Sequence, residues 1–222
     1  MKGKLIVMEG TDGSGKSTQF ARLCQRLEQA GVPFQKLAFP QYSEPSSALI
    51  RMYLAGEFGT HPSDVNAYAA SAFYAVDRYA SYKKVWGEWY ENGGLVVADR
   101  YTTSNAVHQA SKLPEGEREA FFHWLYDFEY DKLGLPKPDE VLYLAVDTDA
   151  TVQMLRAREK ATNTHADIHE QDTAYLRTCS ETGRQAADVL GWRKVECHEN
   201  GALRSIEDIS DEIWGAVAPL LN

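Results

Sequence analysis

The sequence of 222 residues is 44% hydrophobic and 25% charged, which is typical of a soluble globular protein with one domain. Its net charge of −9 argues against an extended polyanion such as DNA or RNA as a partner. A small phosphorylated ligand is not excluded, because it needs only a local cationic pocket.

The three cysteines are scattered and lack C-x-x-C spacing, so we expect reduced thiols. The first apolar run ends at Glu9 and is too short for a signal peptide, and no apolar run approaches transmembrane length. These features predict a cytoplasmic protein that does not bind a membrane or nucleic acid.

The first predicted elements surround a phosphate-binding loop. Residues 4–8 (KLIVM) indicate a buried strand, and apolar residues at helical spacing follow from Phe20 onward. Between them, residues 10–17 (GTDGSGKS) fit G-x-x-x-x-G-K-[ST], in which backbone N–H groups and a helix N-terminus converge on phosphate oxygens. The pattern places Lys16 at the terminal phosphates of a nucleotide and makes the Ser17 hydroxyl a magnesium ligand. The predicted nucleotide-binding residues are Gly10, Thr11, Asp12, Gly13, Ser14, Gly15, Lys16, Ser17 and Thr18.

Asp12 is unusual in an anion-binding loop, because its carboxylate repels phosphate. Two interpretations stay open. The carboxylate points away from the nucleotide phosphates toward a hydroxyl of a second substrate, or it is a solvated acid that bonds its own backbone.

The next elements predict a parallel sheet. Residues 34–39 indicate a second strand that stops at Pro40. A helix with an apolar face follows, formed by Ala48, Leu49, Met52 and Tyr53. A strand, a helix and a second strand in this rhythm form a βαβ unit, which implies parallel pairing.

A long helix comes next, and Ser63 is its expected N-cap. Tyr74 and Arg78 lie one turn apart on one face of this helix. They could form a platform for a flat base, but from the helix alone we favour an ion pair between Arg78 and a nearby acid. The rest of the helix carries an apolar stripe that indicates core or a subunit interface rather than a cofactor site. The stripe consists of Tyr68, Ala72, Ala75, Tyr79, Tyr82, Trp86 and Trp89.

Residues 95–99 (LVVAD) predict a buried strand that ends in an acid. An Asp at this place near a phosphate loop is the Walker-B pattern, so we expect Asp99 to hold the magnesium shell. Arg100 follows directly, at the edge of the sheet where α/β proteins bind ligands. Thr102 or Thr103 is the expected cap of a helix that carries Ser104, Asn105 and His108.

The remaining elements are predicted as a packing helix around Phe121, strands at 139–146 and 193–197, and a last helix capped by Ser205. Between the two strands we expect a helix over about 149–160 and a mobile polar loop at 161–166. Asp167 and Glu170 then have capping-box spacing, which is more common than a metal site there.

The arginines at the end of the 149–160 helix, Arg156 and Arg158, suggest a lid. In phosphoryl transfer the transition state spreads negative charge over the oxygens of the moving group, so catalysis needs positioning and cations. Lys16, magnesium, Arg100 and one lid arginine form such a set. The absence of an N-K-x-D signature disfavours a GTPase, and the chain is too short for a large ATPase machine.

The combination of motifs resembles the thymidylate kinase family nearly from end to end. Residues 9–19 (EGTDGSGKSTQ) are similar to that family's phosphate loop, and Phe39-Pro40 matches the element after its second strand. Residues 73–78 (FYAVDR) resemble its base-binding helix, and Asp99-Arg100-Tyr101 with Ser104-Asn105 resembles its D-R-[YH]-x-x-S segment.

The resemblance implies a P-loop NTPase-type α/β fold: a three-layer sandwich with a five-stranded parallel sheet and helices on both faces. It implies one nucleoside monophosphate kinase domain over 1–222 with a short lid at about 154–168, and a homodimer. The implied reaction moves the γ-phosphoryl group of ATP to dTMP with Mg²⁺, giving dTDP for dTTP synthesis. The implied catalytic residues are Lys16, Asp99, Arg100, Arg156 and Arg158. The substrate-binding residues would be Asp12, Phe39, Tyr74, Arg78, Arg100, Ser104, Asn105 and His108, and the metal ligands Ser17 and Asp99.

The chain departs from the family pattern at four places, of which the mildest is Tyr74 in place of the usual stacking phenylalanine. Gly13 stands where some members have an arginine, which fits a catalytic arginine in the lid. Tyr42 lies near the place of a missing acceptor-phosphate arginine, for which Arg51 is a candidate substitute. His108 stands where an aromatic residue, often Tyr, crowds the 2′ position of the sugar.

Two alternatives remain from the residues. A deoxynucleoside kinase would use a neutral hydroxyl acceptor and benefit from a carboxylate base near strand two, where this chain has Phe39-Pro40-Gln41-Tyr42. A non-catalytic nucleotide-binding protein on the same scaffold is opposed by the intact Lys16, Ser17 and Asp99.

Overall fold

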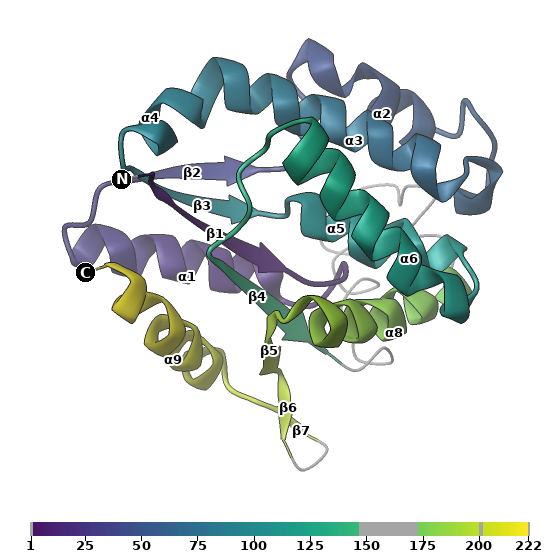
Figure 1. Cartoon of the computed structure of the whole chain (residues 1–222). Helices are drawn as coiled ribbons and strands as arrows, with labels where there is room; N and C mark the ends of the chain where they lie inside the picture. Colours follow the sequence, from purple (N-terminus) through teal and green to yellow (C-terminus); the bar gives the residue numbers. More distant parts are fainter. Residues whose placement is uncertain (1, 147–172, 200–201, 222) are drawn as a thin grey trace.

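The computed structural model describes residues 2–146, 173–199 and 202–221. At its centre lies a parallel sheet of five strands in the order β2-β3-β1-β4-β5 (Figure 1). All five predicted strands are confirmed. They are β1 (Lys4–Glu9), β2 (Phe34–Ala38), β3 (Leu95–Asp99), β4 (Glu140–Ala145) and β5 (Arg193–Glu196).

The strand register brings two acids to one edge of the sheet. β1 pairs with β3 from Lys4 opposite Leu95 to Met8 opposite Asp99. Because the strands are parallel, their carboxyl ends meet at the same edge. Glu9 at the end of β1 therefore lies beside Asp99 at the end of β3, and the phosphate loop leaves the sheet at this edge.

Helices cover both faces of the sheet, as the alternation of side chains in β1 requires. Ile6 and Met8 point to one face, where they pack against α1 (Lys16–Gln29) and α9 (Ile206–Val217), which lie side by side (Figure 1). Leu5 and Val7 point to the other face. The predicted three-layer α/β sandwich is thereby confirmed.

The second face is covered by a larger group of helices. These include α3 (Ala67–Ser81), which continues through the π-helical segment η3 (Tyr82–Trp86) into α4 (Gly87–Glu91), together with α5 (Thr102–His108), α6 (Glu115–Tyr126) and α8 (Thr173–Leu190). Smaller elements are α2 (Ala48–Leu54), the π-helical η5 (Asp127–Lys132), the 3-10 segments η1 (Pro45–Ser47), η2 (Pro62–Asp64), η4 (Ala110–Lys112) and η6 (Ala218–Leu221), and the hairpin of β6 (His198–Glu199) and β7 (Ala202–Leu203).

The predicted start of the long helix at Ser63 is wrong. Residues 62–64 form the separate segment η2, and α3 begins only after Asn66, whose side chain accepts a hydrogen bond from the backbone N–H of Ala69 at 2.9 Å. Part of the apolar stripe is core, since Ala75 and Trp86 are fully buried, but Tyr79 keeps 39% of its surface exposed. In α2, Ile50 and Tyr53 are buried while Leu49 is exposed, so the buried face differs from the predicted one.

The helix caps were predicted with mixed success. Ser205 caps α9 as expected, accepting from the Asp208 backbone N–H at 3.0 Å. Thr102 and Thr103 do not cap α5, because both lie inside the helix and donate their hydroxyls to buried carboxylates. The N-cap of α5 is instead Tyr101, whose side chain makes no capping hydrogen bond.

Several predicted features lie outside the described residues. They are the helix at 149–160 with Arg156 and Arg158, the loop at 161–166, the capping box at Asp167, and the lid at about 154–168. Within the part of the chain that the structure describes, no helix combines the length and apolar character that a membrane crossing requires.

Candidate active site

The phosphate loop joins the end of β1 to the start of α1. Gly13 and Gly15 have φ angles of 79° and 78°, which L side chains rarely adopt, so glycine is required at both turns. Gly15 is the N-cap of α1, and the N–H of Thr18 bonds to its carbonyl at 3.1 Å. The positive end of α1 therefore faces the carboxyl edge of the sheet, as anion binding at a helix N-terminus requires.

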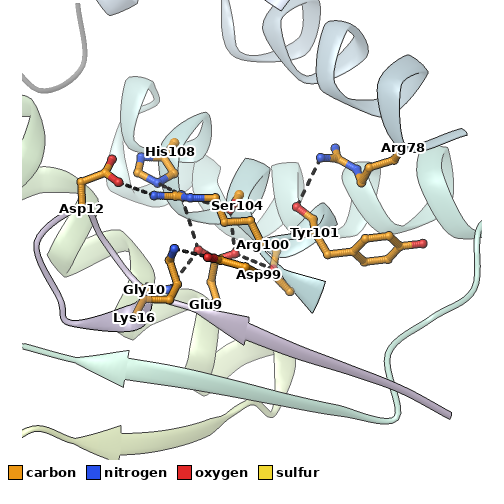
Figure 2. A network of polar contacts seen from close by, with 11 residues as sticks. Glu9, Gly10, Asp12, Lys16, Arg78, Asp99, Arg100, Tyr101, Ser104 and His108 are labelled. Carbon is orange, nitrogen blue, oxygen red and sulfur yellow. Dashed lines mark hydrogen bonds and ion pairs between the residues drawn. The ribbon is translucent and has the colours of Figure 1, made fainter. Parts of the chain in front are cut away.

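Lys16 and Asp99 form an ion pair across this edge. Lys16 Nζ lies 2.5 Å from Asp99 Oδ1, and only 8% of the lysine surface is exposed (Figure 2). Burial and the nearby Arg100 guanidinium lower the pKa of Lys16, although Asp99 opposes that shift. Both partners of the pair are thus held at the mouth of the phosphate loop.

Arg100 follows β3 in a left-handed conformation with φ 69°, and its N–H bonds to Met8 O at 3.0 Å. This turn directs the side chain toward the phosphate loop, where its Nη2 donates to Asp12 Oδ1 at 2.6 Å (Figure 2). Burial alone would lower the pKa of Arg100, but the carboxylates of Asp12, Glu9 and Asp99 outweigh it and raise that pKa. Arg100 is therefore a permanent cation at the site.

The ion pair with Arg100 shows where the Asp12 carboxylate points, which the sequence left open. Its carboxylate points to a guanidinium, which neither of the two interpretations included. The side chain keeps 26% of its surface exposed, so it remains accessible to a substrate. A role at a substrate hydroxyl stays a prediction.

His108 lies on the other side of the Arg100 guanidinium. Arg100 Nη1 is 2.8 Å from His108 Nε2 and 3.3 Å from Ser104 Oγ. Since arginine can only donate, Nε2 must be the acceptor, and the imidazole is neutral with its hydrogen on Nδ1. Ser104 and His108 are thus brought together with Arg100, as the sequence predicted for one site.

Glu9 is a functional candidate that the sequence reasoning missed. It is fully buried and accepts from the Gly10 N–H at 3.0 Å and from the hydroxyls of Thr103 and Ser104 at 2.7 Å each. Its Oε1 lies 3.7 Å from Arg100 Nη1. The signal that identified Asp99, an acid at the end of a buried strand beside the phosphate loop, applies equally to Glu9.

Arg78 and Asn105 belong to a second, buried network. Arg78 is 1% exposed and makes a two-pronged ion pair with Glu129, with Nε to Oε2 at 2.7 Å and Nη2 to Oε1 at 2.5 Å. The predicted pairing of Arg78 with an acid is confirmed. The mutual charges raise the pKa of Arg78 although burial opposes this. A contact of Arg78 with a base stays a prediction.

Comparison with known proteins identifies the family. A family model for thymidylate kinases matches residues 8–213. The chain is 35% identical over 194 residues to the thymidylate kinase of Mycobacterium tuberculosis strain H37Rv, covering 85% of this chain and 87% of that one. It is 33% identical over 214 residues to the Homo sapiens thymidylate kinase, covering 96% and 88%. The chain belongs to the thymidylate kinase family.

The fold agrees with this assignment. A solved structure of thymidylate kinase from Candida albicans matches with a TM-score of 0.71 and 20% identity, covering 99% of this chain and 92% of that one. At 20% identity the match shows the fold alone. This fold is the P-loop NTPase architecture that the resemblance implied.

Other predicted family positions are placed by the structure without a test of their roles. Phe39 is buried and packs against Tyr101 with ring centroids 5.9 Å apart, and Tyr74 is half-buried on α3. Arg51 donates to the carbonyls of Tyr42 at 2.7 Å and Glu44 at 3.1 Å. It thus holds the segment after β2, and its role as a substitute for an acceptor-phosphate arginine stays a prediction.

Proposed function

We propose that this thymidylate kinase family member transfers the γ-phosphoryl group of ATP to dTMP, giving dTDP for dTTP synthesis. The observation that carries the proposal is the convergence of a phosphate loop, Lys16 and Arg100 at one edge of a parallel sheet. Phosphoryl transfer depends mainly on positioning and on cations around the moving group. The family match over residues 8–213 supports dTMP as the acceptor.

On the donor side, the backbone of residues 10–18 would cradle the phosphates of ATP. Lys16 would exchange Asp99 for the terminal phosphates, because a phosphate carries more negative charge than a carboxylate and offers several acceptor oxygens. Burial strengthens this contact, since charges attract more strongly where water is excluded. The low exposure of Lys16 supports that role.

On the acceptor side, Arg100 would exchange Asp12 for the phosphate of dTMP. Its planar fork of donors suits a phosphate better than an ammonium does. Asp12, once released, would be available to a hydroxyl of the acceptor sugar, and His108 would limit the space at its 2′ position. Tyr74 would stack on the base, with Arg78, Asn105, Phe39 and Ser104 around it.

Magnesium fits the residues at the donor side. Mg²⁺ prefers oxygen ligands and is usually held by one or two protein groups together with substrate phosphates and waters. Ser17 follows Lys16 in the first turn of α1, and Asp99 Oδ1 already binds the Lys16 ammonium there. Among the described residues there is no cluster of three or more metal-binding side chains, which a phosphate-bound Mg²⁺ does not need. When bound, the ion would neutralise charge on the phosphates, with Ser17 and Asp99 as its protein ligands.

Gly13 supplies no charge to the moving group, so a further cation has to come from elsewhere. We propose that one of Arg156 and Arg158 supplies it. Two residues that lie two apart on a helix point in nearly opposite directions, so the two arginines would have unequal roles.

A homodimer is the proposed assembly. On α3, Val76 and Tyr79 lie on one face and keep 54% and 39% of their surfaces exposed, and contact with a second copy would bury both. We also propose a cytoplasmic location. The cysteines Cys24, Cys179 and Cys197 are all buried free thiols, as expected for a reducing compartment.

A coupled ADP-release assay against a panel of acceptors tests the proposed function. dTMP should give the highest kcat/KM, above dUMP, dCMP, dGMP and dAMP. Unphosphorylated thymidine should give no activity above the ATPase background. Turnover of thymidine without turnover of dTMP would instead indicate a deoxynucleoside kinase.

A further inference from the structure

The carboxylate of Glu129 is the hub of a buried network between three elements. It lies in the π-helical segment η5, is fully buried and accepts four hydrogen bonds. Two come from Arg78 on α3, one from Thr102 Oγ1 at 2.8 Å and one from Asn105 Nδ2 at 3.0 Å on α5. One carboxylate thus fixes two side chains that the proposed function places at the base.

The network decides which way the Asn105 amide faces. Its Nδ2 bonds to Glu129 Oε1 at 3.0 Å and to the Ser71 carbonyl at 3.2 Å. Both partners can only accept, so the nitrogen has to lie on their side and both of its hydrogens are used. What Asn105 can offer a ligand is therefore the oxygen Oδ1, an acceptor.

The network also locks Arg78 as a rigid donor. Its Nε and Nη2 bond to Glu129, and its Nη1 bonds to the Tyr101 carbonyl at 3.3 Å. A guanidinium held at three of its nitrogen–hydrogen groups cannot swing away from an unsuitable ligand. Whatever it presents to a base is a donor.

We propose that Glu129 is a positioning residue that sets base selectivity in the acceptor site. Thymine carries a carbonyl at C4 and a hydrogen on N3, which match a donor and an acceptor. Cytosine carries an amino group at C4 and an acceptor at N3. The amino group would face the Arg78 donor, and N3 would face the Asn105 acceptor, so neither hydrogen bond could form. Sites built this way reject the wrong analogue strongly, because buried polar groups stay unpaired. The inference rests on the proposed function.

The test compares binding of dTMP and dCMP, measured by isothermal titration calorimetry, in the parent and in Glu129→Gln. Glutamine keeps the shape but has one acceptor oxygen for four donors, so Arg78 loses its ionic anchor. We expect the preference for dTMP over dCMP to fall about 10- to 100-fold, while the affinity for ATP changes less than about twofold. An unchanged preference would overturn the inference. A parent that does not prefer dTMP would contradict the proposed function as well.

Thr102→Val is the matched control. It removes one donor from the same carboxylate but leaves the bonds to Arg78 and Asn105, so stability should fall while the dTMP preference stays at the parental value. A parallel loss of preference in Thr102→Val would show that Glu129 acts only through general stability, which would overturn the inference. Glu129→Asp, which keeps the charge on a shorter arm, serves if the glutamine variant does not fold.

A measurement on the parent protein is independent of any variant. In ¹⁵N-labelled protein, both Nδ2 hydrogens of Asn105 should exchange slowly with solvent, with and without dTMP, because Glu129 and Ser71 hold them. Fast exchange in the free protein would contradict the fixed orientation of the amide.

Discussion

At the scale of single residues, the site is built from cations that are held by carboxylates, and in the proposed reaction the phosphates of the two nucleotides would replace these carboxylates. Lys16 pairs with Asp99, and Arg100 pairs with Asp12. Unpaired buried charges are expensive, so these carboxylates stabilise the cations in the free protein. They also keep both cations at the carboxyl edge of the sheet, close to where the phosphates of two nucleotides would meet.

Arg100→Ala tests the acceptor side of this arrangement. If Arg100 binds the phosphate of dTMP, its loss removes a charge-assisted contact, and KM for dTMP should rise about 30-fold or more. KM for ATP should change little, and Arg100→Lys should restore activity only in part because the planar fork is lost. Equal effects on both KM values would make Arg100 a general structural residue instead.

The lid arginines are tested by separate substitutions, Arg156→Ala and Arg158→Ala, in single-turnover phosphoryl transfer. The catalytic arginine should lose roughly 10³–10⁵-fold in rate, as arginine fingers do. The other variant should stay within a few-fold of the parent. Parental rates in both variants would exclude a lid arginine, and Lys160 and Arg51 would be the next candidates.

Sequence patterns found Lys16, Asp99 and Arg100 but not the buried carboxylates Glu9 and Glu129. Lys16, Asp99 and Arg100 were predicted because a loop motif and strand ends mark them. Glu129 carries no local signal, since its partners are 24 to 51 residues away in the chain. Long-range pairing of this kind depends on how helices pack, which a pattern along one helix does not contain.

At the scale of elements, Lys112 links η4 to the region between α2 and α3. Its Nζ donates to Tyr53 Oη and to the Val65 carbonyl, each at 2.9 Å, and lies 4.8 Å from the centre of the Tyr53 ring. Burial lowers the pKa of Lys112 to about 7. Between about pH 7 and the pKa of an unfolded lysine, the unfolded chain holds a proton that the folded protein lacks.

Stability should therefore rise with pH in this window, by at most about 1.4 kcal/mol per pH unit from Lys112. Urea unfolding at pH 7.0 and 8.0 measures it, where the buried cysteines Cys24, Cys179 and Cys197, whose pKa values are raised, act only slightly in the opposite direction. Lys112→Met should abolish most of the rise. Lys137→Met, which removes an exposed lysine over the Tyr126 ring, should keep it. An equal rise in both variants would contradict a titrating Lys112.

Strands were easier to predict than helix boundaries. The three central strands β1, β3 and β4 are short apolar runs bounded by glycine, proline or charge, and the burial of most of their residues leaves few alternatives for them. Helix starts depend on which side-chain oxygen accepts from the free backbone N–H groups of the first turn. Ser63 and Thr102 had the right residue type for a cap, but Asn66 caps α3, and the Thr102 hydroxyl donates to a buried carboxylate.

At the scale of the whole molecule, one parallel sheet gathers the ends of all its strands at a single edge, which is why residues 9–18, 99–108 and the start of α1 meet. The helix layer that contains α3 lies on the face of the sheet away from α1 and α9 (Figure 1). In the proposed dimer this layer would face a second copy. The exposed side chains of Val76 and Tyr79 on α3 form the surface on which we propose that the two copies meet.

Light scattering coupled to size-exclusion chromatography tests the assembly. The parent should have twice the mass of one 24.9 kDa chain. Val76→Glu should reduce it to one chain, because a charge on the apolar face of α3 opposes burial. Val189→Glu places the same charge on an exposed apolar residue of α8 and should leave the dimer intact. A monomeric parent, or a Val76→Glu variant that stays dimeric, would contradict the proposed interface.

The most direct test of the proposed activity follows the phosphoryl group itself, from γ-labelled ATP in the presence of dTMP under single-turnover conditions. We expect the label on the β-phosphate of dTDP. The rate of transfer should fall on the order of a hundredfold or more in Lys16→Ala. It should stay parental in the control Lys36→Ala, which removes an exposed lysine of β2. Label released only as inorganic phosphate, or an undiminished rate in Lys16→Ala, would contradict phosphoryl transfer to dTMP at this site.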